Sequence, residues 1–266
     1  MQRVTAKEYD SMAACDFYKN FQYIRSIERI AELHGIAVEV SGDFEAFRKI
    51  RVSQPKRLPI SPIFDPHVSP IDEHNGFWIK GTDEGGEVVH LQAVSLQDLG
   101  AATLAEHLHG RRVAYAPPGV EVDLDRSVFS AAEASRRISG KVCYHGELWL
   151  KGGPNGYRGH GLTCALPRLA LALAYLEWAP SFMFGLVHPL AACKGLAARE
   201  GYMHLEPRGI LWQRPEDAGV FEEWLVWMSR DNLQQLMQFV PSDLYEQLES
   251  KNKVGDALSN RVQVAA

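Results

Sequence analysis

The spacing of apolar side chains near the start of the chain predicts a long amphipathic helix from Tyr9 to Leu33, with Gly35 as a stop signal. The next residues, IAVEV at 36–40, predict a short strand because β-branched residues dominate them. Asp43 is then placed to cap a helix through 44–51. The chain therefore begins with helix, strand and helix.

Prolines spread through 53–75 exclude a continuous helix or a central strand there. This stretch is an extended loop or a linker, and we favour a loop that lines a cleft. Two β segments within 76–96, joined by the turn DEGG at 83–86, are typical of a hairpin. A short helix is expected over 99–109.

After residue 110, glycine and proline residues interrupt the hydrophobic pattern more often. Residues 110–140 predict an insertion of uncertain form with one short helix over 129–138. The elements expected after it are a strand at 141–150, an apolar helix from 162, a buried strand at 181–187, a helix at 190–199 ended by Gly201, a strand pair at 202–207 and 209–215 with its turn at 207–209, and an amphipathic helix at 221–240.

The helix after 162 contains a proline, Pro167, beyond its first turn. An interior proline costs about 3 kcal/mol, so we expect a kink there or a helix that begins nearer Ala165. The tail from Ser250 onward is polar and is expected to fray.

Composition and charge narrow the class of protein. The chain has 266 residues, 46% of them apolar, and a net charge of -5, which argues against a nucleic-acid partner. No signal peptide and no run of about 18 apolar residues is visible, so a cytoplasmic protein without membrane contact is expected. The four cysteines stand far apart, and neither a metal site nor a disulfide framework is predicted.

The strand at 141–150 carries titratable side chains at alternate positions. Cys143, His145, Glu147 and Trp149 point to one face by the period of two. These groups form either a reactive face or a solvated strand face.

A glycine-rich turn at 151–161 leads directly from this strand into the apolar helix. Free amides at the helix start, together with Arg158, predict an anion site, and a structural loop without a ligand is the alternative. The turn lacks the Lys-Ser/Thr pair of a Walker loop, so nucleoside triphosphate binding is not expected.

The segment YRGHGL at 157–162, between a strand and a helix, resembles the acyl-CoA pyrophosphate motif of the GNAT superfamily of N-acetyltransferases. Arg158 and Gly161 fill its first and fourth positions, and Thr163 stands where glycine or alanine is usual. Residues 190–202, which end in Gly-Tyr, resemble the helix that follows in that family.

The resemblance implies an α/β (α+β) fold with a mixed, mostly antiparallel central sheet flanked by helices. Its fourth and fifth strands would splay apart to admit the pantetheine arm. The expected organisation is an N-terminal helical extension at 1–35, an acyltransferase domain at 36–214 with its insertion around 110–140, and a C-terminal helical extension at 215–266.

The resemblance also implies transfer of an acyl group from acetyl-CoA or another acyl-CoA to an amine by direct attack. Glu147 is the first candidate for the base and His145 the second. The residues expected to hold the cofactor are Leu150, Lys151, Tyr157, Arg158, Gly159, His160, Gly161, Leu162 and Thr163.

Two positions depart from the family pattern. Ala197 stands where a proton-donating tyrosine is usual, and Leu190 where an asparagine is usual. The donor to the thiolate is therefore left open between His188, Tyr202 and a water molecule. A catalytically silent CoA-binding or regulatory module is the alternative function.

Transfer from acyl carrier protein or aminoacyl-tRNA fits the acidic chain less well. The expected partner is a small-molecule or peptide amine, and the last helix offers a surface for a homodimer.

Overall fold

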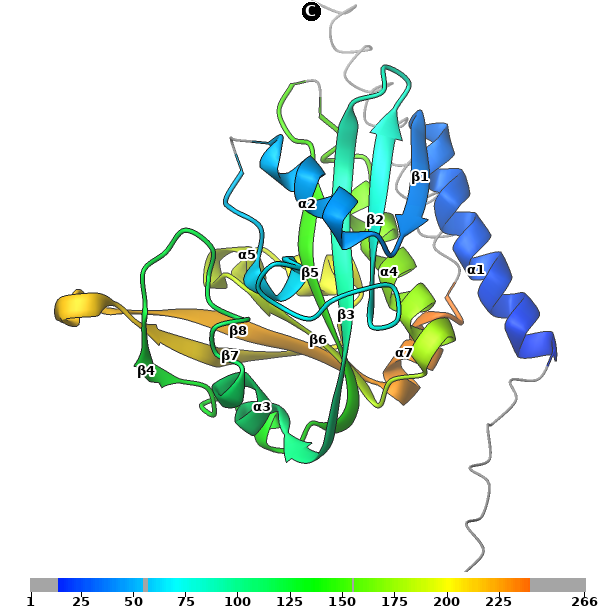
Figure 1. Ribbon diagram of the computed structural model, residues 1–266. Coiled ribbons are helices and arrows are strands. Elements are labelled where there is room, and N and C mark those ends of the chain that lie inside the picture. The colour runs from blue at the N-terminus through cyan, green and yellow to red at the C-terminus, as the bar shows by residue number, and fades with distance from the viewer. Residues whose placement is uncertain (1–13, 55–56, 155, 240–266) are drawn as a thin grey trace, which may run out of the picture.

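The computed structural model describes residues 14–54, 57–154 and 156–239, and its centre is an eight-stranded sheet with the order β1-β2-β3-β5-β6-β8-β7-β4 (Figure 1). The strands are β1 Ile36–Ser41, β2 Gly76–Asp83, β3 Val88–Thr103, β4 Asp123–Val128, β5 Ser139–Leu150, β6 Phe182–Val187, β7 His204–Gln213 and β8 Val220–Ser229. The helices are α1 Ala14–Leu33, α2 Phe44–Val52, α3 Leu104–Gly110, α4 Leu162–Trp178, α5 Pro189–Cys193, α6 Leu196–Glu200 and α7 Arg230–Leu236.

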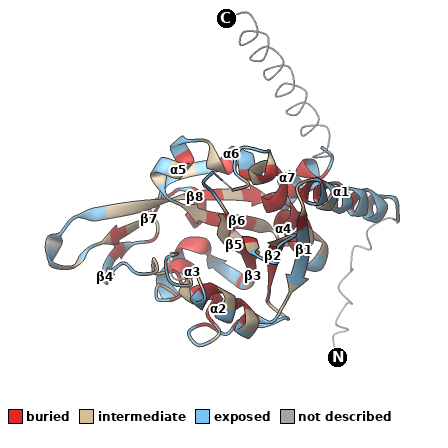
Figure 2. Cartoon of the chain, turned by 90° about the horizontal axis from the view of Figure 1, so that it is seen from above, coloured by how far each residue is buried: buried red, intermediate tan, exposed pale blue. Residues whose placement is uncertain are grey.

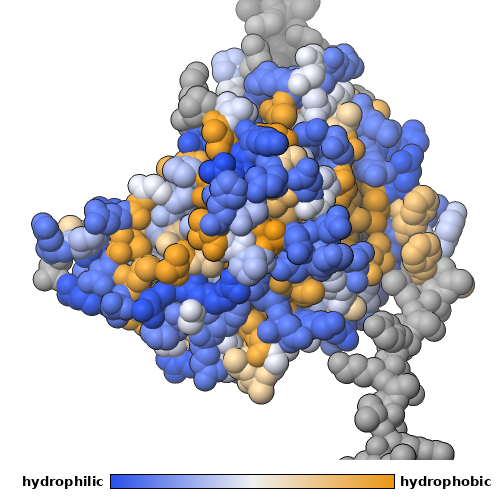
Figure 3. Space-filling model, viewed as in Figure 1, coloured by the Kyte–Doolittle hydropathy of each residue, from blue (hydrophilic) through white to orange (hydrophobic). Residues whose placement is uncertain are grey.

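Helices cover both faces of the sheet, and each face has its own apolar core (Figure 2). On one face α1 and α4 pack together, with Ile27 and Leu169 fully buried between them and the sheet. On the other face α2 and α3 bury Phe47 and Leu108. The surface around α2 and α3 is largely hydrophilic, with apolar side chains in patches between the polar ones (Figure 3).

The pairing of β5 with β6 is parallel and short. Hydrogen-bonded partners run only from Val142–Phe182 to Tyr144–Phe184, although β5 continues to Leu150. Beyond Tyr144 the two strands therefore part, while the other strand pairs described are antiparallel. The predicted fold class is confirmed: the sheet is mixed, mostly antiparallel, flanked by helices and splayed in the middle.

The helix predicted over 221–240 is wrong for its first half. Residues 220–229 form β8, which lies inside the sheet between β6 and β7, and helix α7 covers only 230–236. Leu225 and Val226 are adjacent and both fully buried, one against each face. Burial on both faces removes the alternation by which a strand is recognised. The helical extension expected for 215–266 is thus incorrect over 220–229, and 240–266 lies outside the described residues.

Other boundaries also differ from prediction. Strand β3 continues to Thr103, where a capping box with Glu106 starts α3, so the helix expected from 99 begins at 104. The expected strand pair around 207–209 is one strand, β7, with an irregular register and Arg208 at φ 60°. Within residues 110–140, β4 pairs with β7, and the helix expected over 129–138 is reduced to one 3-10 turn.

Two helices behave differently from expectation. The helix predicted at 190–199 is divided into α5 and α6 by Gly195, which has φ 75°. Helix α4 begins at Leu162 and runs through Pro167, so the later start near Ala165 is wrong. Arg168 donates to the carbonyl oxygen of Cys164, beside the turn that Pro167 deprives of an N–H donor.

Candidate functional site

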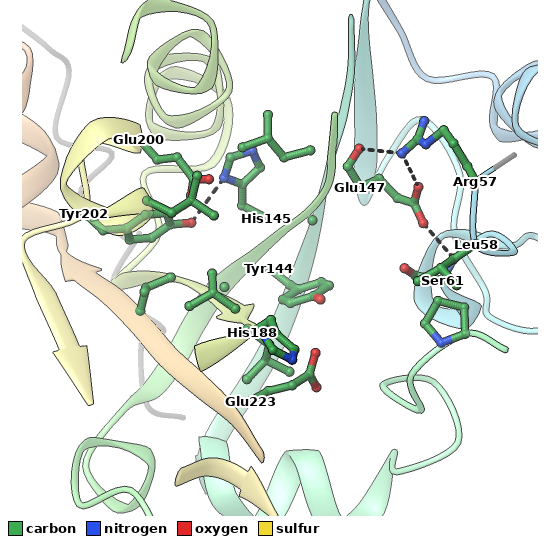
Figure 4. Close-up of a pocket in the computed structure, with 18 of the residues that line it drawn as sticks. Arg57, Leu58, Ser61, Tyr144, His145, Glu147, His188, Glu200, Tyr202 and Glu223 are labelled. Atoms are coloured by element: carbon green, nitrogen blue, oxygen red, sulfur yellow. Dashed lines mark hydrogen bonds and ion pairs between the residues drawn. The ribbon is translucent and has the colours of Figure 1, made fainter. Parts of the chain in front are cut away.

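A cavity of about 380 Å³ lies where β5 and β6 part, and it has lining residues on both faces of the sheet (Figure 4). We call the part on the α2 face the arginine lobe; it is lined by Arg51, Arg57, Ser61, Tyr144, Glu147 and Glu223. We call the part on the α4 and α6 face the tyrosine lobe; it is lined by His145, Gly185, Leu196, Glu200, Tyr202 and Val226. The proline-rich loop supplies Arg57, Leu58, Pro59 and Ser61, which confirms that it lines a cleft.

A β-bulge divides the predicted reactive face of β5. Trp149 is paired with Leu91 and Gly146 with Ala93, so two residues of β5 stand opposite one residue of β3. Glu147, inside the bulge, has φ 56°. The extra residue turns the Glu147 side chain to the α2 face, while His145 stays on the α4 face. The prediction that the two side chains share a face is wrong for this reason.

The Glu147 carboxylate is enclosed by donors. It accepts hydrogen bonds from Nε of Arg51 at 2.5 Å and from the backbone N–H of Ser61 at 2.7 Å, and Nη2 of Arg57 lies 3.5 Å away. Its side chain is only 3% exposed. These contacts make Glu147 the anchor that fixes α2 and the proline-rich loop to β5, and its oxygens are already engaged.

His145 is held in one tautomer by its neighbours. The side-chain amide of Gln92 donates to the Leu166 carbonyl oxygen at 2.7 Å, so its oxygen is left to accept from His145 Nε2 at 3.0 Å. Nδ1 of His145 is then unprotonated and accepts a hydrogen bond from the Tyr202 hydroxyl at 3.2 Å. Burial lowers the pKa of His145 to about 4 and raises that of Tyr202 well above 10. Both side chains are therefore neutral at pH 7.

Glu200 is a site residue that sequence reasoning missed. It ends α6, is 4% exposed, and points into the tyrosine lobe beside His145 (Figure 4). It has no hydrogen bond or ion pair with any residue in the described ranges, and burial raises its pKa to about 8. Glu200 follows Ala197 by three residues, which places both on one side of α6. This three-residue spacing was the sequence signal from which Glu200 could have been identified as a site residue.

A pH-dependent stability follows from the Glu200 pKa. Between the ordinary value of 4.5 and about 8, the folded chain holds a proton that the unfolded chain has lost. The free energy of unfolding should therefore fall as pH rises through this window, by up to about 1.4 kcal/mol per pH unit. Urea unfolding from pH 5 to 8 should show this slope in the wild type and a smaller slope in Glu200→Gln. The exposed control Glu177→Gln should keep the wild-type slope, and parallel curves for all three proteins would contradict the assignment.

His188, another predicted candidate, caps α5. Its Nδ1 accepts from the Leu190 N–H at 3.2 Å, and its ring lines the cavity near Glu223 (Figure 4). The structure therefore brings Glu147, His145, His188 and Tyr202 to one cavity, in two lobes.

The residues predicted to hold the cofactor lie along the turn into α4, and none of them lines the cavity. Nε of Arg158 donates to the Leu150 carbonyl oxygen at 3.0 Å, and Lys151 pairs with Glu87 at 2.7 Å. Tyr157 donates its N–H to Lys151, and the His160 ring lies 5.6 Å from the His34 ring. The side chains of Arg158 and Lys151 are thus engaged within the chain.

The start of α4 keeps free donors. Gly161 is the N-cap residue at φ 77°, and Leu162 and Thr163 are the first helical residues. Their N–H groups donate no hydrogen bond to any of the described residues. Such amides at the start of a 17-residue helix are suited to an anion. Gly159 precedes them at φ 97°, a backbone conformation that favours glycine.

Neither a metal-binding cluster nor a membrane-spanning helix is found within residues 14–54, 57–154 and 156–239. These ranges contain no group of three or more His, Cys, Asp or Glu side chains that could hold a metal ion. No helix in them combines the length and the apolar character needed to cross a membrane.

No family profile and no curated protein matches the chain, but solved structures do. One is aminoglycoside acetyltransferase AAC(6')-Ib with coenzyme A and kanamycin, at 12% identity over 75% of this chain and 98% of that chain, with a TM-score of 0.40. Another is the dodecameric spermidine N-acetyltransferase from Vibrio cholerae, at 10% identity over 74% of this chain and 95% of that chain, with a TM-score of 0.41. A third is FeeM, an N-acyl amino acid synthase from uncultured soil microbes, at 11% identity over 82% of this chain and 95% of that chain, with a TM-score of 0.36. The mixed sheet and the parting of β5 from β6 agree with the fold that the resemblance to the GNAT superfamily implies.

Proposed function

We propose that the chain is an acyl-CoA-dependent N-acyltransferase in which an amine attacks the thioester directly within a ternary complex. The observation that carries the proposal is the cavity at the parting of β5 and β6, which joins two lobes on opposite faces of the sheet. The tyrosine lobe and the start of α4 lie on one face, so the acyl donor is assigned to that face. The arginine lobe is left for the acceptor amine.

In this reaction one proton moves from nitrogen to sulfur. The amine lone pair forms a C–N bond at the thioester carbonyl carbon, the tetrahedral adduct collapses, and the C–S bond breaks. The sulfur leaves as a thiolate that must be protonated, and the nitrogen must lose a proton.

Glu200 is the residue we assign to protonate the thiolate. It is held protonated near pH 7, it lines the tyrosine lobe, and it lies one helical turn beyond Ala197, where the resemblance implies a tyrosine. Once Glu200 has given its proton to the thiolate, its carboxylate accepts the proton that the nitrogen loses, which resets the site. The neutral pair of His145 and Tyr202 lines the same lobe. Glu147 takes a positioning role in this scheme, because its oxygens already hold Arg51 and Ser61.

The free N–H groups of Gly161, Leu162 and Thr163 would hold the pyrophosphate of the donor. Replacing Thr163 by aspartate places a carboxylate at these amides and should weaken acetyl-CoA binding by at least about tenfold. Thr163→Asn, of the same size and without the charge, should bind like the wild type. Calorimetric titration with acetyl-CoA measures both. Absence of wild-type binding at millimolar ligand, or equal affinities for the two variants, would contradict the site.

A silent CoA-binding module is the second candidate, and Ala197 is the residue that favours it. It predicts acetyl-CoA binding without thiol release in the presence of amines. A homodimer remains a prediction, to be tested by the mass of the protein in solution.

A further inference from the structure

The arginine lobe holds more positive than negative charge at one end. Arg51 and Arg57 share a single carboxylate, that of Glu147, and the side chains of the three are 3%, 15% and 3% exposed. Arg51 uses Nε on Glu147 and Nη2 on the carbonyl oxygens of Leu58 and Pro59, and its Nη1 is buried without a hydrogen-bond partner. Two guanidinium groups against one carboxylate leave one cation uncompensated.

Arg57 is the more accessible of the two cations. Its guanidinium lies 4.9 Å from the centre of the Trp149 ring, and Nη1 donates to the side chain of Gln54 at 3.0 Å. Burial lowers the Arg57 pKa to about 10, so the group is charged at pH 7. A planar cation at the wall of a cavity is suited to a carboxylate.

The opposite end of the same lobe is acidic. Glu223, on β8, lines the cavity and accepts from the indole N–H of Trp212 at 2.8 Å. Among the described residues no cation pairs with it. Burial raises its pKa. Tyr144 lies between the two ends with its hydroxyl directed into the lobe (Figure 4).

We propose that the acceptor is a small amine that also carries a carboxylate, an amino-acid-like zwitterion, with its carboxylate on the Arg57 and Arg51 end and its amine on the Glu223 end. The inference rests on the proposed function. A charge buried without a partner is costly, and a zwitterion compensates both ends of the lobe at once. A polyamine would compensate Glu223 and leave the guanidinium end unpaired. Before attack, the ammonium passes one proton to the Glu223 carboxylate, which releases that proton to solvent before the next turnover.

The test compares free amino acids with their C-terminal amides, which keep the amine and lose the carboxylate. Thiol release from acetyl-CoA is followed for both sets, with spermidine and phosphoethanolamine as further acceptors. We expect at least one amino acid to be acylated with a kcat/KM about tenfold or more above that of its amide. Arg57→Gln should raise KM for that amino acid about tenfold, leave KM for the amide unchanged, and be partly rescued by Arg57→Lys. Arg112→Gln, which removes a half-buried arginine that does not line the cavity, is the matched control.

The outcomes separate the two proposals. If acetyl-CoA binds but the amides, spermidine or phosphoethanolamine are preferred, or if no amino acid reacts, the zwitterion inference is overturned and the CoA site stands. If Arg57→Gln raises KM for acid and amide alike, Arg57 has only a structural role and the inference fails as well. If acetyl-CoA does not bind, the proposed function itself is wrong.

Discussion

Replacing Glu200 by glutamine is expected to lower kcat by about 100-fold or more, because a positioned general acid typically contributes at least that much. Glutamine keeps the size of the side chain and cannot give a proton to the thiolate. The change should act on kcat, with the affinity for acetyl-CoA altered little. Steady-state kinetics with saturating acceptor would measure it.

The pH profile gives this prediction a second readout. The protonated carboxyl is the active form, so wild-type kcat should fall as pH rises through the Glu200 pKa of about 8. The residual activity of Glu200→Gln should lack that fall. Glu177→Gln, on the exposed side of α4, should match the wild type in rate and profile. A Glu200→Gln rate within about threefold of the wild type, with the same pH dependence, would remove Glu200 from the mechanism.

The second large effect is expected on stability. Glu147→Leu should reduce the free energy of unfolding by about 3 to 5 kcal/mol, because it leaves the Arg51 guanidinium buried without its carboxylate. Urea unfolding followed by circular dichroism would measure the loss. Glu45→Gln is the matched control: Glu45 pairs with His67 at the surface, where a pair contributes about 1 kcal/mol or less.

A second variant of Glu147 tests whether this residue is a structural anchor or the general base. If Glu147 were the general base, Glu147→Gln would lower kcat of the folded protein by about 100-fold or more, whatever its effect on stability. If Glu147 is a structural anchor, Glu147→Gln should lower the free energy of unfolding, and the activity of the folded fraction should stay close to that of the wild type. The ratio of the two effects therefore decides between the sequence-based role and the structural one.

The sequence predicted the first half of the sheet because its signals are local. Asp43 caps α2, and the turn at 83–86 joins β2 to β3, as expected. Strand β8 could not be predicted in this way. Its identity depends on β6 and β7, which enclose it on both edges, and neither partner is visible in a window of ten residues.

The site was predicted in part for similar reasons. His145 and Tyr202 were identified from the strand and the Gly-Tyr motif, and the cavity contains both. The bulge at Glu147 leaves no mark in the apolar pattern, and a single inserted residue changes the face of a side chain. In the sequence, Glu200 resembles an exposed charged residue at the end of a helix. In the structure, the packing of α6 against α4 buries it.

Gly146 and Gly185 lie where β5 and β6 part, and both line the cavity without a side chain. A Cβ at Gly146 would meet the Phe64 ring at 2.8 Å, and one at Gly185 would meet the His145 carbonyl oxygen at 3.2 Å. Under the proposed function, donor and acceptor occupy opposite sides of the sheet and touch only through this opening. Neither reactant then has to depart before the other arrives, so the enzyme should accept them in either order and show intersecting lines in double-reciprocal plots.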